Sequence, residues 1–195
     1  MKFNLSHKKA AVIVQNNDDR LFFEDLTKKH NAIYLIPGSG VDLNKFKFTP
    51  YSLSKNRVIF PSRLLYQKGL KEFVQAAKKL VKQEPEWEFI LVGASDYKSP
   101  DRVKENELKG WINSGVVKWL GHQKDMVPIL KSAGIVCLPS YREGMPKSLL
   151  EAAAIGRPVV TISFSALVMD TKLPADTISF SNLVMDTKTH TFLQI

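Results

Sequence analysis

Short apolar runs alternate along this chain with longer segments in which apolar residues recur every three or four positions. The short runs are rich in Val, Ile and Phe, which favours buried strands. The longer segments carry lysines between their apolar positions, as amphipathic helices do. Expected strands lie at 10–15, 32–37, 57–60, 88–92, 116–120, 134–138 and 157–162. Expected helices lie at 70–83, 104–114, 125–133 and 147–155.

From residue 57 onward, the pattern gives five strands linked by four helices through connections of a few residues. Parallel strands need such crossover helices, and the helices cover both faces of the sheet. The sequence therefore predicts an α/β fold with a doubly wound, mainly parallel sheet, which is a Rossmann-like architecture. The two earlier apolar runs precede this unit.

The end of the chain differs from the rest. Residues 161–172 (TISFSALVMDTK) recur as residues 177–188 (TISFSNLVMDTK), with eleven of twelve positions matching at a period of 16. The ten glycines of the chain all precede residue 157. Two copies do not make a solenoid, so we interpret 161–195 as an aberrant duplicated tail.

Composition excludes several classes of protein. Hydrophobic residues make up 44% of the chain and charged residues 24%, which excludes global disorder. The single cysteine excludes a disulfide framework and suits a reducing compartment, and no apolar run is long enough for a membrane-spanning helix. We therefore expect a cytoplasmic protein. The net charge of +9 attracts anions, but does not choose among nucleic acid, acidic lipid and phosphorylated small molecules.

Ligands of open parallel sheets bind outside the carboxyl ends of the strands, so the segments that follow the strands are the candidates for chemistry. Arg63 and Lys68 follow one strand, and Arg142 and Glu143 follow another. These segments are polar and charged, whereas the strands that lead into them are apolar.

The segment after the strand at 134–138 also begins a helix. Pro146 suits the first helical position and Gly144 precedes it, so Glu143 lies in the loop and Glu151 about one turn inside the helix. The free backbone N–H groups within residues 145–148 would then form an anion site, favoured by the helix dipole. The alternative is that Glu143 only caps the helix and Glu151 is a surface residue.

Other catalytic motifs are absent from the sequence. There is no G-x-x-x-x-G-K-[ST] phosphate loop, no G-x-G-x-x-G after a strand, no G-x-S-x-G and no H-E-x-x-H. The four histidines lack metal-ligand spacing, and Cys137 lies in an apolar strand, where it is expected to be a buried hydrophobe.

Several motifs, in this order, resemble those of retaining glycosyltransferases of family four, the "glycosyl transferases group 1" type. They are Arg63–Gly69 (RLLYQKG), Pro139–Glu151 (PSYREGMPKSLLE) and Gly156–Val160 (GRPVV), with further matches at Gln15–Asp18, Gly38–Asp42 and Val92–Gly93. These enzymes have the two-domain GT-B fold, and the similar stretch here is their C-terminal, donor-binding domain. The Glu143-x7-Glu151 pair matches the family's E-x7-E motif.

The resemblance implies roles for these residues. Arg63 and Lys68 would hold the donor diphosphate, Glu143 would contact the sugar hydroxyls, and Glu151 would bind the ribose. The catalytic set would be Glu143, Arg63 and Lys68. The donor-binding set would be Arg63, Lys68, Glu143, Gly144, Met145, Pro146, Lys147, Ser148 and Glu151.

The resemblance also implies the reaction and its partners. A nucleotide-diphosphate sugar, with a UDP-sugar favoured, would donate its sugar with retention and without a metal or other cofactor. The acceptor would be a saccharide or lipid-linked saccharide of bacterial polysaccharide synthesis. The cytoplasmic protein could then associate peripherally with the inner face of the membrane. Nucleic acid is not expected as a partner. The alternative function is a non-catalytic module that binds nucleotide or nucleic acid.

The same resemblance suggests how the chain is divided. Residues 1–52 would be a remnant of the acceptor domain with the interdomain linker, 53–160 the donor-binding domain, and 161–195 the aberrant tail. We expect a chain truncated at both ends, inactive alone, that self-associates through exposed apolar surface.

Overall fold

The computed structural model describes residues 10–27, 32–36, 38–50, 56–141, 143 and 145–161. Its main body is a five-stranded sheet with the strand order β5-β4-β3-β6-β7, in which every neighbouring pair is parallel. This confirms the predicted doubly wound α/β fold. The strands are β3 (Arg57–Pro61), β4 (Glu88–Val92), β5 (Lys118–Trp119), β6 (Ile135–Leu138) and β7 (Val159–Thr161).

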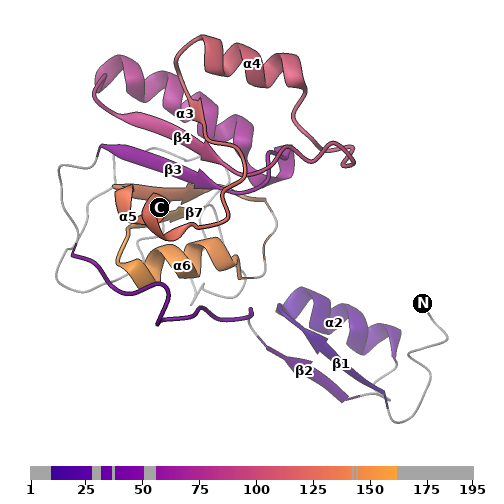
Figure 1. Ribbon diagram of the computed structural model, residues 1–195. Helices are drawn as coiled ribbons and strands as arrows, with labels where there is room; N and C mark the ends of the chain where they lie inside the picture. The colour runs from indigo at the N-terminus through magenta and orange to yellow at the C-terminus, as the bar shows by residue number, and fades with distance from the viewer. Residues whose placement is uncertain are drawn as a thin grey trace.

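Helices link these strands and cover the sheet. Figure 1 shows α3 and α4 on one side of the sheet and α6 on the other, and α5 packs against α6. The central strands are therefore buried on both faces, which is why they contain continuous apolar runs. The helices are α3 (Leu70–Gln83), α4 (Glu105–Asn113), α5 (Val127–Ser132) and α6 (Lys147–Ile155), with the 3-10 turn η1 at Tyr66–Lys68.

The core forms where α3 packs on the sheet. Leu70, Phe73 and Val74 are buried on one face of α3, as its helical periodicity predicts. The Phe73 ring lies between two sheet residues, with ring centroids 5.2 Å from Phe60 and 5.9 Å from Phe89. This packing fixes α3, and with it the turn η1 that precedes the helix.

The beginning of the chain forms a smaller unit. The strands β1 (Ala11–Val14) and β2 (Ala32–Leu35) pair in parallel as a separate two-stranded sheet, and helix α2 (Asn17–Leu26) connects them (Figure 1). The helix α2 is not among the expected elements. None of its residues is buried.

Residues 38–50 run along the main body beside α6. The backbone N–H of Thr49 donates to the carbonyl of Ile155 at 3.0 Å, and the buried Arg157 guanidinium donates to the carbonyl of Thr49 at 2.6 Å. Phe46 is part of the core. The GRPVV motif thus contributes a buried arginine that anchors this segment.

Some predictions concern residues outside those described. The duplicated tail from residue 162 onward is one of these, and so is the proposed boundary near residue 52, because 51–55 are not described. The division into three parts stays a prediction. Within the described ranges, none of the helices has the length and apolar composition needed to cross a membrane.

Candidate functional site

The strand order reverses between β3 and β6. From β3 the chain moves outward to β4 and β5, and it then returns to place β6 and β7 on the opposite side of β3. The loops that follow β3 and β6 therefore separate at the sheet edge, and ligands of such sheets bind at this switch point. The candidate residues Lys68 and Glu143 come from these two loops.

Lys68 lies in the turn η1, and its ammonium group forms an ion pair with the carboxylate of Glu143. Their side chains are only 17% and 16% exposed. The structure therefore brings together two of the predicted site residues. The carboxylate of Glu143 binds the lysine of the neighbouring loop, which does not support the alternative that Glu143 only caps α6.

Close backbone contact holds the two loops in this arrangement. Gly69 has a φ of 74°, and a Cβ atom there would lie 1.8 Å from the carbonyl oxygen of Pro139, so only glycine fits. The carbonyl of Gln67 accepts the backbone N–H of Tyr141 at 3.0 Å and the hydroxyl of Ser140 at 3.2 Å. The position of Lys68 is thus fixed relative to the loop after β6.

Arg63 also follows β3 but is directed to another partner. Its guanidinium donates to the carboxylate of Asp96 at 2.8 Å, and its side chain is 59% exposed. Asp96 lies in the loop after β4. In the structure Arg63 pairs with this carboxylate, and Lys68 pairs with Glu143. Asp96 is a residue that the sequence analysis missed.

The start of α6 fits the predicted anion site. Pro146 occupies the N-cap position, one residue before the expected first helical position, and gives no side-chain cap. Among the described residues, no group accepts a hydrogen bond from the backbone N–H of Lys147 or Ser148. The first turn contains no acidic residue. Gly144 and Arg142 lie outside the described residues.

Glu151 lies one turn inside α6 and is not a surface residue. Its side chain is 12% exposed, and its carboxylate is 4.0 Å from the ammonium group of Lys147. Burial raises the pKa of Glu151, while Lys147 and Lys45 act in the opposite direction. A carboxylate that is costly to bury, on the first turns of a helix at the switch point, is typical of a functional position.

The segment Gly38–Asp42 also reaches this region. Gly38 has a φ of 68°, and a Cβ atom there would lie 2.9 Å from the Cβ of Met145. The loop before α6 is therefore covered by a segment from the beginning of the chain. Two motifs that lie far apart in the sequence thus meet beside the candidate site.

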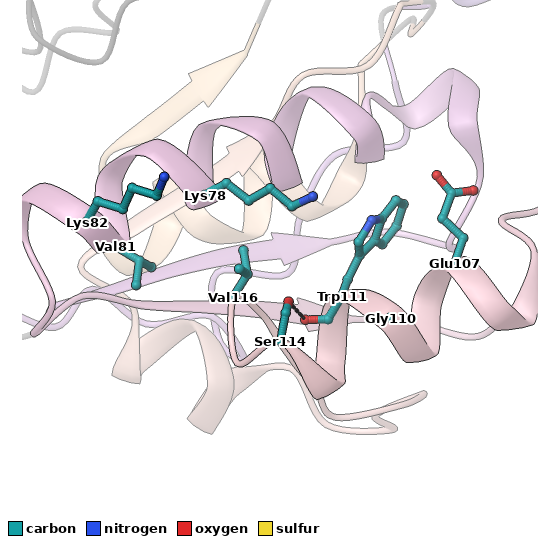
Figure 2. A pocket seen from close by; sticks show the side chains of 8 residues that line it. All are labelled: Lys78, Val81, Lys82, Glu107, Gly110, Trp111, Ser114 and Val116. Carbon is teal, nitrogen blue, oxygen red and sulfur yellow. Dashed lines mark hydrogen bonds between the residues drawn. The ribbon is translucent and has the colours of Figure 1, made fainter.

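A groove of about 540 Å³ lies elsewhere, between α3 and α4. Figure 2 shows Lys78 and Lys82 on the α3 side, with Trp111 and Glu107 on the α4 side. None of the predicted site residues lines it. It is distinct from the strand-end site, although Glu107 accepts a hydrogen bond at 2.5 Å from the hydroxyl of Tyr66 in η1.

Two other predictions concern chemistry elsewhere. Cys137 is 1% exposed, and burial raises the pKa of its thiol to about 12, which confirms that it is a packed hydrophobe. Among the described residues, no three His, Cys, Asp or Glu side chains are grouped so that they could hold a metal ion. The metal requirement of the reaction stays a prediction.

Comparison with known proteins identifies the family. Residues 55–174 match the family model of the glycosyl transferases group 1. The chain is 33% identical over 174 residues to the N,N'-diacetylbacillosaminyl-diphospho-undecaprenol alpha-1,3-N-acetylgalactosaminyltransferase of Campylobacter jejuni, covering 82% of this chain and 43% of the relative. It is 30% identical over 162 residues to the UDP-Gal:alpha-D-GlcNAc-diphosphoundecaprenol alpha-1,3-galactosyltransferase of Escherichia coli, covering 76% of this chain and 41% of the relative.

A solved structure supports the fold. The Anabaena protein HepE, crystallised with UDP and glucose, aligns with a TM-score of 0.64 at 22% identity, over 85% of this chain and 49% of that one. This chain therefore spans less than half the length of each of these relatives. The family match covers more than half of the chain and includes Arg63, Lys68, Glu143 and Glu151. The chain belongs to the glycosyl transferases group 1 family.

Proposed function

We propose that this chain binds the nucleotide-diphosphate part of a UDP-sugar, and that the protein works as a retaining glycosyltransferase. The observation that carries the proposal is the meeting of Lys68 and Glu143 at the point where the strand order reverses. A cation and an acid placed side by side can hold the diphosphate and the sugar of one donor. Arg63, in the same loop after β3, adds a second cation.

The diphosphate would bind where positive groups face the strand ends. Arg63 can contact phosphate through two parallel hydrogen bonds, and Lys68 acts as a point charge. In the structure both are paired with carboxylates, of Asp96 and Glu143 respectively. A bound diphosphate would take over Arg63 from Asp96 and share Lys68 with Glu143, which would turn toward the sugar hydroxyls.

Transfer requires that negative charge on the departing diphosphate be stabilised. Lys68, Arg63 and the backbone N–H groups of Lys147 and Ser148 would supply this stabilisation in place of a metal ion. The position of Lys68 is fixed before the donor arrives, because the two loops are tied together through Gln67 and Gly69. Glu151, largely buried in α6, would bind the ribose.

The acceptor is proposed from the relatives. The names of the Campylobacter and Escherichia enzymes both describe a sugar carried on diphospho-undecaprenol. We therefore propose a lipid-linked saccharide as the acceptor of the whole protein, in the synthesis of a bacterial polysaccharide or glycan.

A thermal-shift series tests the donor class. UDP, UDP-glucose, UDP-galactose and UDP-N-acetylgalactosamine should each raise the melting temperature of the chain saturably. An unrelated oligonucleotide should give a shift that disappears between about 50 and 200 mM salt, because non-specific nucleic-acid binding depends steeply on salt. A salt-resistant shift with the oligonucleotide and none with the UDP compounds would favour the non-catalytic nucleic-acid-binding module instead.

A further inference from the structure

Lys68 lies in a turn that has few hydrogen bonds of its own. The turn η1 spans only Tyr66–Lys68, and it is followed directly by Gly69 in a left-handed conformation. Its first backbone N–H groups, like those at the start of any helix, need acceptors from elsewhere. The groups that supply these acceptors help to hold the backbone that carries Lys68.

Asp101, in the loop between β4 and α4, supplies both acceptors. Its backbone carbonyl accepts the N–H of Tyr66 at 3.0 Å, and its carboxylate accepts the N–H of Gln67 at 2.8 Å. The carboxylate bond is charge-assisted, which makes it stronger than a neutral one. Asp101 thus stabilises the turn from the loop after β4, in addition to the contacts made by the loop after β6.

Gln67 transmits this contact to the site. Its N–H is bound by Asp101, and its carbonyl binds the N–H of Tyr141 and the hydroxyl of Ser140. One residue therefore connects the loops that follow β4, β3 and β6. The next residue in the chain is Lys68, which reaches Glu143 across the same boundary.

We propose that Asp101 is a positioning residue, whose carboxylate sets the place of Lys68 beside Glu143 and thereby tunes binding of the donor diphosphate. This rests on the proposed function in so far as it concerns the diphosphate. Asp101 contacts neither Lys68 nor Glu143 in the hydrogen bonds described for it, so it acts through the backbone of Gln67.

Two variants separate geometry from charge. Asp101→Asn and Asp101→Ala remove the same negative charge near the site, but the amide oxygen of asparagine can still accept the N–H of Gln67. Other contacts should keep the turn folded in both, because the backbone bond to Tyr66 does not need the side chain and the Tyr66 hydroxyl binds Glu107. A matched control is Asp125→Ala, which removes a carboxylate that accepts the N–H of Val127 at 3.1 Å in another loop.

The experiment has one readout without ligand and one with UDP. The first is the nuclear Overhauser effect between the side chains of Lys68 and Glu143, which should be absent in Asp101→Ala and present in Asp101→Asn and Asp125→Ala. The second is titration calorimetry, in which UDP should bind Asp101→Ala about fivefold more weakly than Asp101→Asn, the scale of one missing hydrogen bond.

The outcomes distinguish the two proposals. An unchanged Overhauser effect in Asp101→Ala, with UDP affinity equal to that of Asp101→Asn, would overturn the positioning role. If the effect disappears only in Asp101→Ala while the wild type fails to bind UDP, the positioning of Lys68 is supported and the donor site is rejected. If Asp101→Ala does not fold, hydrogen exchange of the Gln67 amide decides: protection in the wild type supports the role, and exchange at the free rate overturns it.

Discussion

The ammonium group of Lys68 is paired with the carboxylate of Glu143, from a loop 75 residues further along the chain. Both side chains are largely buried, and they come from the loops after two adjacent parallel strands, β3 and β6. The pair therefore joins the two halves of the sheet at the point where its strand order reverses. A phosphate that binds here must either share Lys68 with the carboxylate of Glu143 or replace that carboxylate as the partner of Lys68.

Breaking this pair should lower stability. Lys68→Met and Glu143→Gln should each reduce the free energy of unfolding by about 1–3 kcal/mol, because each leaves a mostly buried polar partner unpaired. The double variant should lose less than the sum, with a coupling of about 1 kcal/mol. Urea unfolding followed by circular dichroism measures both. The exposed pair of Lys109 and Glu105 is the control, and a coupling no larger than that of this surface pair would contradict the prediction.

Releasing Arg63 from Asp96 should strengthen the binding of UDP. Asp96→Asn removes the carboxylate that holds the Arg63 guanidinium in the structure, at 2.8 Å. An exposed ion pair of this kind is weak, so UDP affinity should rise by only about two- to fivefold. Titration calorimetry at fixed ionic strength measures the change. Glu105→Gln, which removes a negative charge from an exposed pair on α4, should leave the affinity for UDP unchanged. If both variants raise the affinity equally, the cause is the change in net charge and not the release of Arg63.

The fold was accessible from the sequence because burial leaves a periodic signal. Leu70, Phe73, Val74 and Ala77 recur at helical spacing, and the structure gives α3 the bounds expected for it. The segment from Pro139 to Glu151 could likewise be placed, since Pro146 fixes the start of α6 to within one residue. The helix α2, none of whose residues is buried, was missed, although Asn16, whose side chain accepts the N–H of Asp19, is a recognisable N-cap.

The loop carboxylates that bind Arg63 and the backbone of Gln67 could not be predicted in the same way. Asp96 and Asp101 lie in a polar loop, and their partners Arg63 and Gln67 are 33 and 34 residues away. A single carboxylate in a loop has no periodicity, and its contact depends on how two loops fold against each other. The pairing of Lys68 with Glu143 was predicted only as convergence on one site, because both residues follow strands of one parallel sheet.

Glu151 should reduce stability at neutral pH. Burial raises its pKa above the ordinary value of 4.5, so the folded protein binds a proton more tightly than the unfolded chain does. Stability is therefore lost as the pH rises from the ordinary value through the raised one. Glu151→Gln should raise the melting temperature at about pH 7, and the gain should shrink as the pH falls toward about 4. If Glu151 binds the ribose, the same variant should bind UDP more weakly. A melting temperature that falls at neutral pH would contradict the burial argument.

The thiol of Cys137 should be unreactive in the folded protein. It is 1% exposed, and burial raises its pKa to about 12, so the reactive thiolate is scarce at about pH 8. Ellman's reagent should label the chain only after addition of denaturant. Complete labelling of the native protein within minutes would place Cys137 at an accessible position and contradict the packing of β6.

The site is tested most directly by titrating UDP into the wild type, Lys68→Met and Lys78→Met. Lys78 lies on α3 at the groove away from the strand ends, so its substitution removes the same charge without touching the site. The account predicts saturable binding by the wild type and by Lys78→Met with equal affinity. Binding by Lys68→Met should be about ten- to a hundredfold weaker, the scale of hydrogen bonds to a charged group. Equal affinity of all three proteins, or no binding by the wild type, would contradict a diphosphate site at Lys68 and Glu143.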